Sequence, residues 1–429
     1  MANFMRALRK CAGALESTSE RSPAFNKALG FLLFLAVWPA GVCRAETVNI
    51  LGVAPLKLSI DLTGATDVST WLIAAITKAN RIAEAGRPAC VYLPSGVYRI
   101  AKNPPQFVGA GCVRGDGPTQ TIIMLDRSFA GDLFSWSEAW ANTKPGPTVT
   151  GLKIIGVNGA RTPQNALVFY DRNDEVFLDN IEIDDVPGRA LYSGVTKHTT
   201  QAYMRESRMR SLRFSRNSAP DVPVIEFSSE GSGVTDATNE IRMSQVDIYG
   251  AKGPSFVIRN NGSGVVRSIT AESLRIEGAE NGSTAADLLT IGDPVMRGTV
   301  EGITFDALEL VDPPKGYAAL RLTAAPGAAA PYQITVRGAI GGGLAHGEGI
   351  RIDAGRSSIF QLSIMHTEGV NVVVGPGASQ LMFDGGGREA CWTYRIDPRS
   401  REGVSFPVWA IGEPAAPQAA RSQARPGGC

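Results

Sequence analysis

The sequence predicts an all-β protein built as a parallel β-solenoid, in which short strands of successive coils stack on one another. The first observation is a short apolar–x–apolar strand that recurs from about residue 149 onward. The six strong copies start 29, 31, 34, 28 and 34 residues apart, at Gly151, Asn180, Ser211, Gln245, Ser273 and Ala307. No helical pattern separates them, and a fixed-order repeat of short strands is typical of a solenoid.

The second observation is a set of short apolar strands between these copies, at residues 166–170, 224–227, 255–259, 287–291, 318–322, 349–353 and 370–374. The third is the run of Gly, Asn, Asp and Ser at the expected corners, where these residues favour turns. An antiparallel two-sheet sandwich is the alternative, because Asn-Gly pairs at 158–159, 261–262 and 281–282 could form hairpin turns.

The composition is that of a globular protein. The 429 residues are 44% hydrophobic and 19% charged, and the 48 Gly follow no three-residue period. Length alone would suggest two or three domains, but a solenoid can run this far as one body. The net charge of +1 argues against a nucleic-acid-binding protein, which would carry a basic surplus.

The N-terminus has the layout of a secretory signal peptide over residues 1–45. Basic residues precede an apolar run at 29–42, and small residues precede a predicted cleavage site after Ala45. The alternative is a membrane anchor, although the run is shorter than the roughly 20 residues that a span needs. We expect an exported mature chain, secreted or periplasmic, with no membrane span. Cleavage leaves 36 basic and 39 acidic residues, so a polyanionic ligand would need a local basic groove.

The first elements of the mature chain are a helix and a pair of strands. Residues 67–85 place apolar side chains at helical spacing, with N-cap oxygens at Asp67, Ser69 and Thr70. Residues 91–100, VYLPSGVYRI, predict a strand, a Pro-Ser-Gly turn and a second strand. A glycine-rich segment, FVGAGCVRGDG, follows.

This order of motifs resembles the N-terminal part of the pectate-lyase-like right-handed parallel β-helix superfamily, over about residues 58–125. The resemblance implies a single domain over 46–410, in which a helix caps the open end of the first coils. Main coils would occupy 149–383, a C-terminal cap 384–410, and a disordered Pro/Ala-rich tail 411–429. The same scaffold supports lyases, hydrolases, epimerases, phage spikes and inert modules.

The resemblance also gives two cysteines a meaning. Coils in such helices have about 22 residues, so Cys90 and Cys112 would stack in neighbouring coils. Stacked strands lie about 4.8 Å apart, which is within reach of a disulfide. We predict that bond, and the state of Cys391 and Cys429 stays open.

Alternation along the six repeated strands predicts one outward residue between two buried ones. The outward row contains Lys153, Glu182, Arg213, Asp247, Arg275 and Glu309. Its sign alternates at every coil, which favours a salt-bridge ladder over a charged-substrate groove. The next outward row contains Ile155, Asp184, Ser215, Tyr249, Glu277 and Val311.

Several residues are candidates for chemistry on a glycan. Paired carboxylates serve glycoside hydrolysis, and a base beside a cation serves a polysaccharide lyase. A basic stretch extends from Arg189 through Arg205, Arg208 and Arg210 to Arg216. The catalytic candidates are Asp184, Asp185, Arg189, Lys197, His198 and Asp247. The substrate-binding candidates, which include two Trp expected to be exposed for sugar stacking, are Trp136, Trp140, Tyr192, Arg213 and Tyr249.

The sequence lacks the catalytic signatures of the best-known members of that superfamily. No acidic cluster has the spacing of the pectate-lyase calcium site, so calcium is suggested by family analogy alone and the cofactor is unknown. No zinc pattern occurs, and Asp184-Asp185 stands without the other polygalacturonase motifs. We therefore carry over the fold and no family's catalytic residues.

From the sequence we expect an exported carbohydrate-active protein whose partner is a polysaccharide, held on the outer face around residues 184–249. As an enzyme it would be a polysaccharide lyase or a glycoside hydrolase of extracellular or capsular glycan. The alternative is a non-catalytic glycan-binding or envelope module on the same scaffold. A virion-type spike is a third possibility, against which the leader argues.

Overall fold

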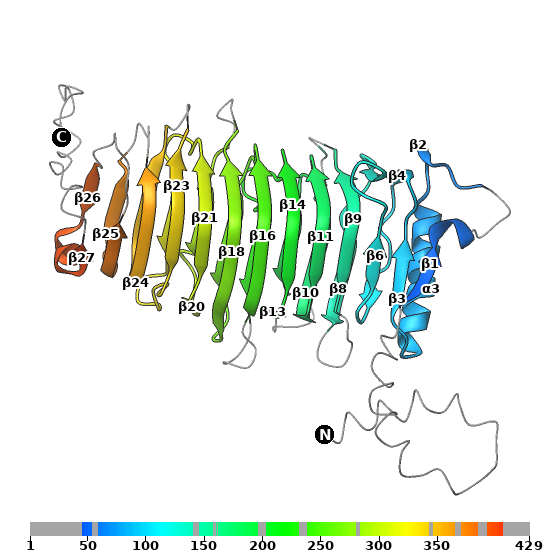
Figure 1. Cartoon of the computed structure of the whole chain (residues 1–429), viewed down its shortest axis with the longest axis horizontal. Helices are drawn as coiled ribbons and strands as arrows, with labels where there is room; N and C mark the ends of the chain where they lie inside the picture. The colour runs from blue at the N-terminus through cyan, green and yellow to red at the C-terminus, as the bar shows by residue number, and fades with distance from the viewer. Residues whose placement is uncertain are drawn as a thin grey trace, which may run out of the picture. The chain divides into compact units, whose positions relative to one another are not determined.

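The chain winds into a parallel β-helix. The computed structural model describes residues 45–53, 59–139, 146–157, 160, 162–195, 203–230, 238–279, 284–342, 346–364, 370–384 and 393–405. Residues Ala45–Cys429 form one compact unit. In its described part, 27 strands join one continuous sheet. The coils follow one another along the long axis (Figure 1). The strand pairs of the described residues are parallel, so the prediction of a solenoid is confirmed and the antiparallel sandwich is excluded.

The sheet bends at corners, which divide it into three faces. Face 1 and face 2 are the first and second halves of the same long strands, and face 3 is built from separate strands. The strands shared by faces 1 and 2 are β9 (Thr148–Ile155), β11 (Phe177–Asp184), β14 (Arg208–Ser215), β16 (Asn239–Tyr249), β18 (Val265–Glu277), β21 (Thr304–Val311) and β23 (Thr335–Gly341). Face 3 contains β5 (Phe107–Val108), β8 (Gly131–Ala139), β10 (Gln164–Asp174), β12 (Leu191–Gly194), β15 (Ile225–Ser229), β17 (Phe256–Asn260), β19 (Leu289–Gly292), β22 (Ala318–Thr323) and β26 (Tyr394–Ile396).

Shorter elements complete the first and last coils. Face 1 also contains β1 (Glu46–Asn49), β3 (Ala89–Tyr92), β6 (Cys112–Arg114) and β27 (Val404–Ser405). Face 2 also contains β2 (Thr63–Asp67), β4 (Gly96–Ile100) and β7 (Thr121–Leu125). The strands that lead from face 3 toward face 1 are β13 (Tyr203–Arg205), β20 (Thr299–Glu301), β24 (Glu348–Ile364) and β25 (Val372–Asp384). Among the residues described above, the helices are α3 (Ser69–Glu84) and the 3₁₀ turns η1 (Ile50–Gly52) and η3 (Pro398–Gly403).

The corner between faces 1 and 2 is a column of residues in the left-handed conformation. The first residue of each strong repeat occupies it, with φ between 52° and 64°: Gly151, Asn180, Ser211, Gln245, Ser273 and Ala307. A single left-handed residue turns the chain sharply without ending the strand ladder on either side. This geometry explains the preference for Gly, Asn and Ser at the start of the repeat.

The core lies inside the coils, where the repeated apolar pairs stack. All twelve predicted inward residues are at most 2% exposed, from Leu152 and Ile154 in β9 to Leu308 and Leu310 in β21. Under face 3, aromatic rings stack along the axis instead. Trp136 lies between Phe107 and Phe169, with ring centroids 5.0 and 4.9 Å apart and nearly parallel planes.

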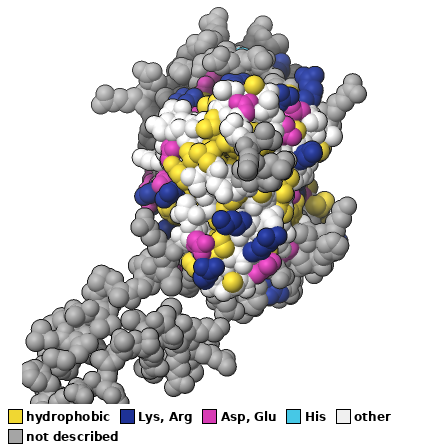
Figure 2. Space-filling view, turned by 90° about the vertical axis from the view of Figure 1, so that its right-hand side faces the viewer, with side chains coloured by type: hydrophobic (Ala, Val, Ile, Leu, Met, Phe, Trp, Pro, Cys, Tyr) yellow, Lys and Arg dark blue, Asp and Glu magenta, His cyan; other side chains and the backbone are white. Residues whose placement is uncertain are grey.

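The N-terminal end is closed by α3, as the resemblance implied. Asp67 Oδ1 accepts the backbone N–H of Ser69 at 2.9 Å where the helix begins, and α3 contacts β1, β3 and β5. Its apolar stripe, which includes Leu72 and Ile76, is buried. Seen from this end, hydrophobic, basic and acidic side chains are interspersed, so this view shows no patch of a single charge sign (Figure 2).

The predicted disulfide is present. Cys90 in β3 and Cys112 in β6 are register partners on face 1, with Cα atoms 4.2 Å apart.

The C-terminal coils extend further than the repeat pattern indicated. β26 and β27 both pair with β25, so residues 393–405 add to the solenoid where we had expected a cap. In the described part of the chain, no helix is long and apolar enough to cross a membrane.

Candidate functional site: an open groove on face 1

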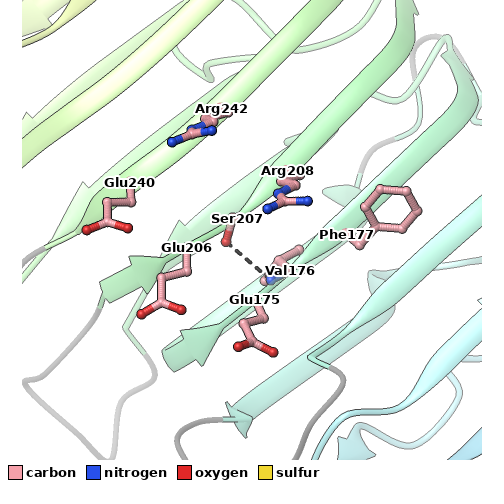
Figure 3. Close-up of a pocket in the computed structure, with 8 residues that line it drawn as sticks. All are labelled: Glu175, Val176, Phe177, Glu206, Ser207, Arg208, Glu240 and Arg242. Carbon is pink, nitrogen blue, oxygen red and sulfur yellow. Dashed lines mark hydrogen bonds between the residues drawn. The ribbon is translucent and has the colours of Figure 1, made fainter. Parts of the chain in front are cut away.

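The candidate site is an open groove on face 1, across β11, β14 and β16. Its first part has a volume of about 390 Å³ (Figure 3) and is lined by Glu175, Val176, Phe177, Glu206, Ser207, Arg208, Glu240 and Arg242. A neighbouring hollow of about 480 Å³ shares three of these residues and is lined by Phe177, Arg208, Met209, Arg210, Arg242, Met243, Ser244, Thr270 and Glu272. Both volumes are in the range of small-ligand sites. We call the two together the face 1 groove.

Strand register places the floor residues of the groove in one axial row. Phe177 pairs with Arg208, Arg208 with Arg242, and Arg242 with Thr270. Each coil therefore contributes one outward side chain, about 4.8 Å from the next. Met209 and Met243, between the outward positions, are buried and anchor the strands to the core.

A second row follows the corner between face 3 and face 1. Glu175, Glu206 and Glu240 have φ of 56°, 48° and 54°, so each coil makes the same left-handed turn at a glutamate. In Figure 3 the three carboxylates lie in a row beside the row formed by Arg208 and Arg242. Each row thus stacks like charges in successive coils.

Four charges of these rows have no side-chain partner within the described residues. All four are exposed, and in the described part of the chain their side chains make no hydrogen bond or ion pair: Glu206, Arg208, Glu240 and Arg242. Arg210, two residues after Arg208 in β14, is paired by contrast. It binds both carboxylate oxygens of Asp179, at 2.7 and 2.9 Å. Those hydrogen bonds raise the pKa of Arg210.

Like charges on directly neighbouring strands destabilise a sheet. A row of arginines without partners is therefore suited to bind an anionic or hydroxyl-rich ligand, because guanidinium groups donate several hydrogen bonds in a fixed fork. The carboxylates beside it can accept hydrogen bonds from hydroxyls or act as acid and base. Phe177 adds an apolar surface at the N-terminal end of the row, and the Arg210 guanidinium lies 5.5 Å from its ring centre.

Asp184 and Asp185, two of the predicted catalytic residues, do not converge. Asp184 pairs with Lys153 of the preceding coil at 2.6 Å, whereas Asp185 binds Arg216 of the following coil at 2.7 and 3.0 Å. Burial acts to lower the pKa of Lys153, but the carboxylates of Asp184 and Glu182 outweigh it and raise that pKa. Because the two aspartates engage different coils, they do not form a glycosidase pair with each other.

The predicted outward row on face 2 is confirmed in register. Its members pair coil by coil in the order Lys153, Glu182, Arg213, Asp247, Arg275 and Glu309. Tyr249 lies in the next row, between the guanidinium groups of Arg213 and Arg275, each 5.5 Å from its ring centre. Asp247, Arg213 and Tyr249 thus belong to a flat charged face, and none of them lines the face 1 groove.

Arg189 and Tyr192 lie together on face 3, away from the groove. The Arg189 guanidinium stacks over the Tyr192 ring at 4.4 Å and also forms an ion pair with Glu226. The Glu226 side chain is fully buried and also binds Arg259, which continues to Asp293 at 3.1 Å. Burial raises the pKa of Tyr192, and the Glu226 carboxylate adds to this shift.

Trp136 does not form the expected exposed platform. It is fully buried between two Phe rings, and its indole N–H donates to the carbonyl of Gly111 at 2.9 Å. Residues 133–136 of β8 are all buried, and the sequence did not indicate that Trp136 lies among them. Trp140, Lys197 and His198 lie outside the described residues.

Most of the groove was not predicted from the sequence. Arg208 was predicted only as part of a basic stretch, and Phe177, Glu206, Glu240 and Arg242 were not among the candidates. The spacing of charged residues relative to the repeat starts could have indicated the two rows of the groove. Glutamate stands five residues before three successive repeat starts, and arginine three residues before two of them.

The superfamily resemblance suggested calcium as a cofactor. We find no calcium site among the described residues. They contain no group of three or more His, Cys, Asp or Glu side chains placed to hold a metal ion. We therefore derive no step through a metal.

Comparison with known proteins gives similarity of fold. No family model matches the sequence, and no curated protein matches it. ORF18 of Geobacillus virus E2 is 10% identical with a TM-score of 0.42, over 86% of this chain and 66% of that one. The A-module of the Azotobacter vinelandii mannuronan C-5 epimerase AlgE4 is 13% identical with a TM-score of 0.38, over 82% and 100%. The Agl-KA catalytic domain is 12% identical with a TM-score of 0.41, over 81% and 64%. The parallel β-helix fold of this chain is established by its own strand pairs, and these likenesses say nothing of its function.

Proposed function

We propose that the protein binds a polysaccharide in the face 1 groove and cleaves it as a glycoside hydrolase. The observation that carries the proposal is the pair of like-charged rows, Glu206 with Glu240 and Arg208 with Arg242, exposed in an open groove without partners among the described residues. A glycan offers hydroxyls, and in acidic sugars carboxylates, to both rows.

The shape of the groove suits a chain-like ligand. It is open to solvent and crosses successive coils, so a polymer could lie across several of them. The mature chain has a slight acidic surplus, so the Arg208–Arg242 row would provide the local attraction that an anionic glycan needs. Phe177 could pack against the apolar face of one sugar.

Glu206 and Glu240 are the candidate catalytic pair. They occupy equivalent positions in neighbouring coils, whose backbones are about 4.8 Å apart. Retaining glycosidases hold their two carboxyl groups roughly 5–5.5 Å apart, one as acid and base and the other as nucleophile. In this arrangement one glutamate would protonate the glycosidic oxygen while the other attacks the anomeric carbon, and water would then release the sugar with retention.

The test is incubation with a panel of acidic and neutral polysaccharides, with reducing ends and the ultraviolet absorbance of unsaturated sugars read together. New reducing ends without new absorbance support a hydrolase. Glu206→Gln and Glu240→Gln should each lower the rate by about a hundredfold or more while the glycan still binds. Glu84→Gln, which changes an exposed glutamate at the end of α3, is the matched control and should leave the rate unchanged.

Two results would contradict this assignment. New absorbance with new ends would indicate a lyase, and full activity of both glutamine variants would place catalysis elsewhere. In that case Arg189 and Tyr192 on face 3 become the next targets.

The second candidate is a non-catalytic glycan-binding or envelope module. The in-register ladder of alternating charges favours it, because it makes face 2 a regular and nearly neutral surface. Glycan binding that is weakened by Arg208→Ala and Arg242→Ala, without any cleavage, would support this function.

We also propose that the leader directs export to the periplasm or the exterior. N-terminal sequencing of protein recovered outside the cytoplasm should begin at Glu46. A chain that retains residues 1–45 in the membrane fraction would instead support an anchor.

A further inference from the structure

Face 2 has a charge pattern that is complementary to itself. Its outward row alternates in sign over six coils, with a cation at one end and an anion at the other: Lys153, Glu182, Arg213, Asp247, Arg275 and Glu309. If a second copy is turned by 180° about an axis along the strands, midway along the row, the order reverses. Every charge then faces one of opposite sign.

We propose that two copies of this chain associate through face 2 as an antiparallel two-fold dimer. The two-fold rotation, which we call the operator, places Lys153 opposite the partner's Glu309 and Glu182 opposite the partner's Arg275. It sets Arg213 opposite the partner's Asp247. Such an interface is isologous, because the same patch serves both subunits.

The centre of the row supports an external partner. At both ends of the row the charges pair within the chain, Lys153 with Glu182 at 3.1 Å and Arg275 with Glu309 at 3.5 Å. Arg213 and Asp247 are direct register partners at the centre and form no ion pair within the described residues. Their contacts inside the chain are weaker: the Arg213 guanidinium lies 5.5 Å from the Tyr249 ring centre, and the Asp247 carboxylate helps to raise the pKa of Arg275. Arg213 and Asp247 are the two residues that the two-fold axis brings together across the interface.

The second outward row is compatible with the same operator. It sets half-buried Ile155 opposite the partner's Val311, and Ser215 opposite the partner's Tyr249. The remaining pair in this row joins two carboxylates, Asp184 and Glu277. Each is already paired in its own chain, Asp184 with Lys153 at 2.6 Å and Glu277 with Arg275 at 2.8 Å.

The size of the patch predicts a weak, salt-sensitive dimer. Five steps of about 4.8 Å make the row roughly 24 Å long. Two such rows cover a few hundred Å² per subunit, less than the roughly 800 Å² of a standard interface. The association should therefore be reversible at micromolar concentrations and should weaken as salt screens the charges.

Sedimentation velocity at low and high salt tests the proposal. We expect a monomer–dimer equilibrium at low salt that shifts to monomer as salt rises. Lys153→Glu should raise the dissociation constant by about tenfold or more, because it places like charges opposite each other twice per dimer. Adding Glu309→Lys in the same chain should restore most of the affinity.

The matched control is Lys78→Glu. It makes the same change in net charge on the exposed side of α3, outside the two rows of face 2. Its dissociation constant should stay within about threefold of the unchanged protein. A loss equal to that of Lys153→Glu would mean that only net charge matters, and would overturn the proposal.

Crosslinking tests the orientation independently of affinity. In the chain that begins at Glu46, which excludes Cys11 and Cys43, and with Cys391 and Cys429 replaced by Ser, the pair Lys153→Cys and Glu309→Cys should form dimers with a short bismaleimide. Within one chain these two positions are five coils apart, so only a partner can bridge them. Efficient crosslinking of the single Lys153→Cys variant would indicate a parallel arrangement. That outcome, or a monomer at low salt, overturns the proposal.

Discussion

The fully buried carboxylate of Glu226 offers the sharpest test of what stabilises the solenoid. Glu226 occupies an outward position on β15, where its register neighbours are Tyr192 and Val257, yet its side chain has no exposed surface. The guanidinium groups of Arg189 and Arg259 each bind one of its oxygens. Burial acts to lower the pKa of Arg259, but the carboxylates of Glu226 and then Asp293 outweigh it and raise that pKa.

Removing one arginine should therefore cost far more than an ordinary ion pair is worth. Arg259→Met leaves Glu226 buried with one cation, and breaking such a pair typically costs about 3–5 kcal/mol. Because Arg189 remains, we expect the lower end, about 3 kcal/mol. Replacing both members, Arg259→Met with Glu226→Met, should recover part of this loss, because no carboxylate remains fully buried, while half-buried Arg189 and Asp293 each lose a partner.

Urea unfolding followed by circular dichroism measures both effects. Arg216→Met, which removes an exposed partner of Asp185, is the matched control and should cost no more than about 1 kcal/mol. The reasoning is refuted if Arg259→Met costs less than about 1 kcal/mol. It is also refuted if the double variant loses the sum of the two single losses, because the two residues would then be independent.

Three further predictions concern stability. Hydrogen bonds from the backbone and hydroxyl of Ser128, together with Arg99, lower the pKa of Asp126 from 3.8 to about 2. Its contribution to folding stability is therefore present above the unfolded pKa and is lost as the pH falls toward 2. Asp126→Asn should make stability depend less on pH in this acid range, and an unchanged dependence would contradict this. Cys90→Ser with Cys112→Ser opens a link across 22 residues and should cost about 3 kcal/mol in urea unfolding; an unchanged midpoint would show that the bond constrains nothing. Ala307→Gly relieves a left-handed alanine with φ of 52° and should stabilise by about 0.5–1 kcal/mol, whereas Ala339→Gly, in an ordinary strand position, should destabilise.

The architecture was predictable because each coil repeats the same local constraints. Alternation placed Leu152 and Ile154 inside and Lys153 outside, and stacking then fixed the register of every later copy. A slip of one residue would turn all the apolar side chains outward, so the burial pattern determines the register. The distance of one coil likewise made the Cys90–Cys112 bond predictable once the family resemblance was recognised.

The groove was less predictable, because face 1 lies before the repeat motif. The apolar–x–apolar motif begins at the corner residue, so it describes face 2 and leaves the preceding half-strand unmarked. Phe177 and Arg208 belong to that half-strand, where the apolar pattern is shorter. The prediction that Trp136 is exposed was wrong for a different reason. Its strand, β8, lies outside the regularly spaced repeats, so the sequence did not show whether its side chain points into the core or outward.

Faces 1 and 2 use the same strands and the same spacing, so the fold does not by itself explain their different charge chemistry. On face 2 the row alternates in sign, and the spacing of about 4.8 Å brings opposite charges together. On face 1 the same spacing stacks Arg208 on Arg242, and Glu206 precedes Glu240 at the neighbouring corner, so like charges meet. A row of like charges lowers the stability of the folded chain. Because these side chains are exposed, a neutral residue at Arg208 or Arg242 would remove the repulsion without disturbing the core. Retaining four exposed charges in this arrangement is what an external ligand would explain, and Arg208→Ala should therefore raise stability slightly while weakening glycan binding.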